Sequence, residues 1–181
     1  MFLCSPSNEN ENGQIVAAYF STKADGPFAC VDCREEVFLR AGRSQVDHFA
    51  HANPITCKFA LGESELHRRC KMEIFEGLRQ HPNTTNVALE RSIGEMRPDI
   101  FAIINETPVA IEVQISSLSL ETIIQRTIRY AQNGNYVLWL LRWTRALDAP
   151  RYAPKVWERW IHAAYLGRAY YWTEGLTVVP C

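Results

Sequence analysis

The sequence predicts a mixed α/β protein made of a small β-rich module and a larger core in which helices alternate with strands. Three observations lead to this prediction. Short β-branched and aromatic runs, broken by glycine and proline, fill the first sixty residues. Residues 61–145 then show, in order, a helix pattern, three strand patterns, a second helix and a fourth strand. The last strand, YVLWLL, is fully apolar, which is typical of a buried central strand.

The composition is that of an ordinary globular protein, since 47% of the 181 residues are hydrophobic and 22% are charged. No window approaches ~18 consecutive apolar residues, so we expect no membrane span. Residues 1–13 lack the basic start and the long apolar stretch of a signal peptide, and we expect a cytoplasmic protein. With a net charge of −1, any contact with nucleic acid has to come from local basic patches.

In the module, residues 13–22 and 35–42 are predicted to be short strands on either side of the segment FACVDC. Cys30 and Cys33 lie in this segment, and two thiolates at this spacing can occupy adjacent corners of a metal tetrahedron. The segment HFAH follows after fourteen residues, and Cys57 follows five residues later. In a cytosolic chain this pattern favours a metal site over a disulfide.

We expect zinc to be held by four residues, with one histidine as an alternate: Cys30, Cys33, His51 and Cys57, with His48 as the alternate. Four protein ligands leave no open position, so this zinc would be structural. It would supply folding free energy that so small a core lacks. The alternative is a small core that buries free cysteines.

The first helix of the core is predicted over residues 61–83 and is stopped by His81-Pro82-Asn83. Glu63, His67 and Lys71 fall at i, i+4 and i+8, on one slanted face, and Glu65 projects about 200° away from Glu63. A charged row of this kind either serves a site or simply faces solvent.

Two strands that follow carry carboxylates at unusual places. Residues 97–105 and 108–116 are joined by the turn NETP and are predicted to form an antiparallel hairpin. Asp99 opens the first strand, and Glu112 lies in the middle of the second, on the same face as Gln114.

If these two carboxylates converge, they repel unless a divalent cation neutralises them. Carboxylate oxygens are the ligands that Mg2+ prefers, and a bound cation can activate water and stabilise charge on a phosphate. The structural alternative is a salt bridge, for instance between Asp99 and Arg97.

The remaining elements follow in short succession. A helix is predicted over residues 118–134, with Ser119 or Thr122 as its cap, and the apolar strand comes next. Residues 146–181 are predicted to form an amphipathic helix and a closing hairpin around Glu174-Gly175. We therefore expect three parts: residues 1–60, 61–145 and 146–181.

The segments RPD and IEVQ, about ten residues apart, resemble the motif of the PD-(D/E)XK nucleases, with Pro98-Asp99 as the proline-aspartate pair. More narrowly, the chain resembles the CoiA-like competence proteins in CVDC, HFAH, ESELHRRCK, RPDI, AIEVQIS, QRTIRYAQNG and YVLWLL, and in the tail WERWIHAAYLGRAYYWTEGL. The resemblance implies a restriction-endonuclease-like core with a zinc-finger-like N-terminal part.

The resemblance also implies roles for particular residues. Asp99 and Glu112 would hold a catalytic Mg2+ or Mn2+, and Glu63 or Glu65 would complete the set of ligands. His67 and Lys71 match the helix pattern of the family without a settled role. The residues expected to contact nucleic acid are Arg97, Arg126 and Tyr130.

One departure bears on activity, because Gln114 stands where the motif has lysine. Lysine orients the attacking water and offsets negative charge, whereas glutamine can only form hydrogen bonds. Lys71, on the neighbouring helix, is our candidate for a replacement cation.

The resulting prediction is a metal-dependent nuclease that hydrolyses phosphodiester bonds of single- or double-stranded DNA, in DNA uptake and recombination or in phage defence. It would act alone, as a homodimer or with a partner protein. The alternative is a non-catalytic nucleic-acid-binding or recruitment protein on the same fold.

Overall fold

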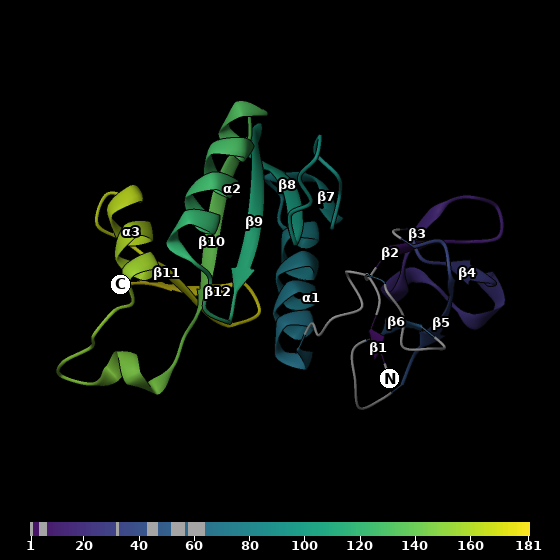
Figure 1. The fold of residues 1–181 in the computed structure, drawn as a ribbon, viewed down its shortest axis with the longest axis horizontal. Coiled ribbons are helices and arrows are strands. Elements are labelled where there is room, and N and C mark those ends of the chain that lie inside the picture. Colours follow the sequence, from purple (N-terminus) through teal and green to yellow (C-terminus); the bar gives the residue numbers. More distant parts are fainter. Residues whose placement is uncertain (1, 4–6, 32, 43–46, 52–56, 58–63) are drawn as a thin grey trace. The chain divides into compact units, whose positions relative to one another are not determined.

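The structure is a computed structural model that describes residues 2–3, 7–31, 33–42, 47–51, 57 and 64–181. It divides into two compact units, Met1–Arg69 and Cys70–Cys181, which are described one at a time (Figure 1). No helix among the described residues is long and apolar enough to cross a membrane.

The N-terminal unit is β-rich, as the sequence predicts. Its strands form one antiparallel sheet in the order β1-β6-β5-β4-β2-β3. The strands are β1 (Phe2–Leu3), β2 (Ser7–Glu9), β3 (Ile15–Ala17), β4 (Phe28–Ala29), β5 (Glu36–Arg40) and β6 (His48–His51). Two short 3-10 helices, η1 (Ala18–Phe20) and η2 (Lys23–Asp25), lie between β3 and β4.

The strand predicted over residues 13–22 is wrong in its second half, where η1 replaces it. The Ser21 hydroxyl donates to the carbonyl of Ala17 at 2.8 Å, and the Ser21 N–H donates to the carbonyl of Ala18 at 3.2 Å. These local bonds close a turn and compete with strand pairing, as serine side chains commonly do.

The core of this unit is small. In β5, Val37 and Leu39 point inward while Glu36, Phe38 and Arg40 are exposed, the alternation expected of a half-buried strand. The buried cluster consists of Ala18, Phe28, Cys30, Val37, Leu39, Phe49 and Cys57. Two of its seven members are cysteines, so the cluster depends on how their thiols are satisfied.

The C-terminal unit contains the helix–strand order that the sequence predicts. Its elements are α1 (Glu65–Gln80, within which the division between the units falls), β7 (Thr84–Leu89), β8 (Ile100–Ile104), β9 (Thr107–Gln114), α2 (Leu120–Gln132), β10 (Tyr136–Arg142), η3 (Arg145–Asp148), α3 (Val156–Ala164), β11 (Tyr170–Glu174) and β12 (Thr177–Pro180).

These strands form a sheet in the order β12-β11-β10-β9-β8-β7. The meander β7-β8-β9 is antiparallel, β10 lies parallel to both β9 and β11, and β12 returns antiparallel to β11. A three-stranded meander followed by a crossover helix and a parallel strand is the restriction-endonuclease-like core that we expected, so the predicted fold class is confirmed.

Local sequence explains where these elements begin and end. The Ser119 hydroxyl caps α2 by accepting the Thr122 N–H at 3.1 Å. Gly134 follows α2 at φ 70°, a left-handed conformation that glycine adopts without strain. Asn105 and Glu106 turn the β8–β9 hairpin with φ of 46° and 65°, values typical of a two-residue type I′ turn.

The crossover helix α2 lies against β10 (Figure 1), and its Arg126 and Tyr130 bond to Glu112 of β9. Its buried residue Ile123 packs with Trp139 and Leu141 of β10 and with Trp157 and Ile161 of α3. This packing fixes the face of α2 that is turned toward β9, where Glu112 lies.

Candidate metal centre and nuclease-like site

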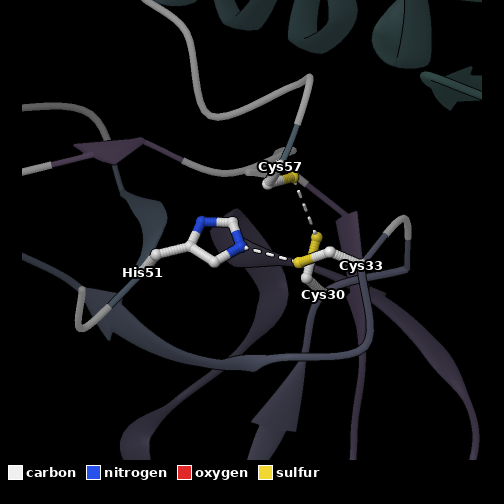
Figure 2. A group of neighbouring side chains, drawn as sticks. All are labelled: Cys30, Cys33, His51 and Cys57. Atoms are coloured by element: carbon white, nitrogen blue, oxygen red, sulfur yellow. Dashed lines mark hydrogen bonds between the residues drawn. The ribbon is translucent and has the colours of Figure 1, made fainter. Parts of the chain in front are cut away.

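Four side chains of the N-terminal unit converge on one point, and Figure 2 shows the three sulfur atoms and the ring of His51 grouped together. The ligand atoms of Cys30, Cys33, His51 and Cys57 all lie within 4.8 Å of one another. The sulfurs of Cys30 and Cys57 are 3.9 Å apart, and the sulfur of Cys33 lies 3.2 Å from Nε2 of His51. A sulfur–sulfur distance of 3.9 Å is far longer than a disulfide bond, which is about 2.05 Å.

The spacing of these atoms suits a tetrahedral zinc site. With Zn–S bonds of about 2.3 Å, the sulfurs at two corners of a tetrahedron are about 3.8 Å apart. Cys30 and Cys33 are presented by the turn between β4 and β5, which is closed by bonds between the Cys30 N–H and the Glu35 carbonyl (2.8 Å) and between the Arg34 N–H and the Cys30 carbonyl (2.9 Å). Three soft thiolates and one imidazole are a donor set that zinc prefers, so the cluster could bind a metal such as zinc.

His51, and not His48, belongs to the cluster. The two residues are three apart on β6, so they point to opposite faces of the strand, although both are buried. Nδ1 of His51 is buried and has no hydrogen-bond partner among the described residues. The sequence left the choice between the two histidines open because the pairing of β6 was not known.

In the C-terminal unit, Asp99 lies immediately before β8 and beside β9. Its Oδ2 accepts the N–H of Val113 at 2.8 Å, and its Oδ1 lies 3.7 Å from Nζ of Lys71 on α1. The bond to Val113 turns the Asp99 carboxylate toward the part of β9 that carries Glu112.

Glu112 is 3% exposed and lies under α2. Its Oε1 accepts hydrogen bonds from the guanidinium of Arg126 and from the hydroxyl of Tyr130, four residues apart on one face of α2. Burial, followed by the nearby carboxylate of Asp99, raises the pKa of Glu112 from its ordinary 4.5 to about 7, although Arg126 and Tyr130 act in the opposite direction. The carboxylate of Asp99 thus disfavours the ionised form of Glu112.

The raised pKa of Glu112 predicts a pH-dependent loss of stability without divalent cations. The Glu112 carboxyl group binds its proton more tightly in the folded protein than in the unfolded chain. Its full contribution to the free energy of unfolding is therefore present below pH 4.5 and is lost as the pH rises through about 7. The shift corresponds to a few kcal/mol, roughly 3, in the free energy of unfolding. In urea unfolding with EDTA, the free energy of unfolding of wild type should fall by about 3 kcal/mol relative to that of Glu112→Gln as the pH is raised from 4 to 8. A difference that is constant over this range would contradict the prediction.

Gln114, at the motif position of the lysine, has its side-chain amide engaged by the backbone. It is 7% exposed, and its side-chain amide donates to the carbonyl of Ser116, just beyond the end of β9. Lys71, which is 2% exposed, brings an ammonium group to Asp99 instead.

Glu90, which is not among the site residues predicted from the sequence, completes this arrangement. Nζ of Lys71 donates to Oε1 of Glu90 at 2.7 Å, and Nη2 of Arg97 lies 3.0 Å from Oε2 of Glu90. Arg97 is therefore paired with Glu90, and its predicted contact with nucleic acid remains a prediction. The feature of the sequence that could have indicated Glu90 is its position directly after β7. Because Leu89 is paired with Ile100, this position lies opposite Asp99 in the β7–β8 pairing.

Glu63 and Glu65 are the residues predicted to supply a third acid from the first helix. Glu63 lies outside the described residues. Glu65, in the first turn of α1, forms an ion pair with Arg68, and the N–H of His67 donates to the hydroxyl of Ser64 at 3.2 Å. Over the described part of the chain, the Cys/His cluster is the only group in which three or more potential ligands meet.

Comparisons with known proteins match two consecutive parts of the chain to one family. The nuclease-like domain of competence protein CoiA matches residues 63–153, and the N-terminal domain of the same protein matches residues 12–60. The chain belongs to the CoiA family of competence proteins. Both the β-rich unit with its Cys/His cluster and the α/β core with its acids therefore lie within regions typical of CoiA proteins.

Competence protein CoiA of Bacillus subtilis (strain 168) is 28% identical over 120 residues, which cover 65% of this chain and 32% of that protein. The matched region is thus about a third of the length of this relative. Among solved structures, SfsA of Pyrococcus furiosus in complex with Ca2+ covers 99% of this chain and 91% of its own chain, at 12% identity and a TM-score of 0.38. A TM-score of this size does not establish a common fold.

Proposed function

We propose that this CoiA-family protein is a metal-dependent nuclease that hydrolyses DNA phosphodiester bonds. The observation that carries the proposal is the meeting of Asp99, Glu112 and Lys71 at the start of β8 and the middle of β9. Two mutually repelling carboxylates beside a buried ammonium group are expensive to maintain unless the site uses them. The match to a nuclease-like domain supports the same reaction class.

The residues present fit a hard divalent cation. Asp99 and Glu112 offer carboxylate oxygens, the donors that Mg2+ and Mn2+ prefer, and Glu63 or Glu65 is the proposed third donor. The cation, when bound, activates water and stabilises charge on the phosphate. Lys71 supplies a positive charge beside Asp99, and the N–H of Val113 fixes the orientation of that carboxylate.

The charges in this region favour an anionic substrate once a cation is bound. When all are ionised, three cationic side chains offset three carboxylates in this region: Lys71, Arg97 and Arg126 against Glu90, Asp99 and Glu112. A divalent cation adds a positive excess, which suits a phosphodiester whose negative charge grows in the transition state. Arg126 and Tyr130 bind Glu112 and, as we propose, also face the phosphate.

The second candidate function is a non-catalytic DNA-binding or recruitment protein. The observation that favours it is Gln114, whose amide is bonded to the Ser116 carbonyl and cannot supply the charge of the motif lysine. On this alternative, the acids and Lys71 form a structural ion-pair network.

Metal removal tests the proposal. Purified protein with labelled single- and double-stranded DNA, and with RNA as a comparison, should cleave in Mg2+ or Mn2+ and should not cleave in EDTA. Readdition of Mg2+ after EDTA should restore cleavage. Gel-shift assays in EDTA should still show binding. Binding without cleavage at every protein and metal concentration would instead support the recruitment function.

For the N-terminal unit, we propose that Cys30, Cys33, His51 and Cys57 hold a structural zinc ion. Four protein ligands leave no position for a substrate, so this ion would stabilise the fold and take no part in hydrolysis.

A further inference from the structure

Glu90 is held in place by its backbone as well as by its side chain. Its N–H donates to the carbonyl of Asp99 at 3.1 Å, and its own carbonyl accepts from Nε of Arg97 at 3.0 Å. The two carboxylate oxygens are divided between two cations, with Oε1 at 2.7 Å from Nζ of Lys71 and Oε2 at 3.0 Å from Nη2 of Arg97.

The backbone of Glu90 is left-handed, with φ at 45°. Glycine or asparagine occupies such a conformation at lower cost, and strained positions of this kind cluster at functional sites. The presence of glutamate there indicates that its side chain matters more than the cost of its backbone conformation.

The partly buried ion pair of Lys71 and Glu90 is itself weak evidence for stability. Desolvation of two charges offsets most of their attraction, and an apolar pair of similar volume is often as stable. What the pair does provide is a defined place for Nζ of Lys71, which lies at the end of a flexible four-carbon stem. Glu90 holds this atom at 3.7 Å from Oδ1 of Asp99.

We propose that Glu90, anchored by Arg97, is a positioning residue that holds the Lys71 ammonium group at the nuclease-like site, so that α1 supplies the charge that Gln114 on β9 does not. This inference rests on the proposed nuclease activity. Glu90 acts through Lys71 and touches neither the cation nor the substrate. It also gives Arg97 a role that does not require contact with nucleic acid.

The test compares Lys71→Met, Glu90→Gln, Glu90→Asp and the double variant Lys71→Met/Glu90→Gln in the full chain. Glu106→Gln, at the other end of the β8–β9 hairpin, is the matched control. For each variant, kcat and KM are measured with DNA at saturating Mg2+, Mn2+ affinity is measured by calorimetry, and folding is checked by thermal unfolding.

We expect Glu90→Gln and Lys71→Met each to lower kcat by about 10- to 100-fold, the size of effect seen when a residue that orients a functional group is removed. KM and Mn2+ affinity should change less than about twofold. The double variant should be no slower than Lys71→Met alone, because Glu90 acts only through Lys71. Glu90→Asp should recover part of the rate.

Three results would overturn the inference. The first is a kcat of the double variant that lies below that of Lys71→Met by the same factor by which Glu90→Gln lowers the kcat of wild type. The second is a normal kcat for Glu90→Gln. The third is a loss of Mn2+ affinity in Glu90→Gln, which would make Glu90 a metal ligand. If Glu90→Gln does not fold, the comparison of Lys71→Met with the double variant, in which both charges of the pair are removed, still decides. If the wild-type protein does not cleave DNA, both the proposed function and this inference are wrong. If the wild type cleaves DNA and one of the three results is found, only the role of Glu90 is wrong.

Discussion

Cys57→Ser is expected to abolish stable zinc binding and to unfold the β-sheet of the N-terminal unit, while the sheet of the C-terminal unit stays folded. The reason is the small size of the N-terminal core, in which two of the seven clustered side chains are cysteines of the proposed site. Structural zinc supplies roughly 10–16 kcal/mol of apparent binding free energy in small zinc-dependent folds, which exceeds the stability of most whole domains. Loss of one ligand therefore removes more than such a core contributes.

Hydrogen–deuterium exchange on the full chain can resolve this effect by segment. Peptides from β3 to β6 should lose protection in Cys57→Ser, and also in wild type treated with a strong zinc chelator, while peptides from β8 to β10 should keep it. Elemental analysis should find one zinc per chain in wild type and in Cys181→Ser, the control at an exposed cysteine. Full protection of β5 and β6 in zinc-free protein would rule out a structural metal.

Asp99→Asn and Glu112→Gln should each reduce Mg2+-dependent cleavage by at least about 1000-fold, which corresponds to about 4 kcal/mol of transition-state stabilisation. Both substitutions keep the shape of the side chain but remove the negative charge that attracts a cation. A neutral amide attracts the Lys71 ammonium group less strongly than a carboxylate does, so Asp99→Asn also weakens the pairing of Lys71 with this position.

The matched control is again Glu106→Gln, which removes an acid from the turn of the same hairpin and should cleave at the wild-type rate. Calorimetric titration with Mn2+ should show weaker binding for both site variants and unchanged binding for the control. Cleavage at wild-type rates by Asp99→Asn and by Glu112→Gln would show that any nuclease activity resides elsewhere in the chain.

The sequence was sufficient for most of the C-terminal fold because its signals are local. The period of the hydrophobic pattern, the Ser119 cap and the Asn105–Glu106 turn each act within a few residues, and all are present in the structure. The β3–η1 segment was mispredicted because the bonds of Ser21 to the carbonyls of Ala17 and Ala18 outweigh the strand preference of its neighbours. Strand propensity alone does not show whether a segment will pair with a neighbouring strand or form local hydrogen bonds of this kind.

For the sites, the sequence established which chemical groups are available: the Cys-x2-Cys pair with its histidines, the two acids of the hairpin and the glutamine in place of lysine. Which of these groups meet depends on the tertiary structure. The pairing of β6 with β5 turned His51 toward the thiols, and the packing of α2 on β10 placed Arg126 and Tyr130 on Glu112.

Glu90 shows most clearly which contacts the sequence alone does not predict. It is nineteen residues from Lys71 and nine from Asp99 in the chain, yet it bonds to both, through its carboxylate and its N–H. The sequence shows a glutamate at the end of a strand, but contacts of this kind depend on how α1 and the β7–β8 pair come together, and no local pattern encodes that geometry.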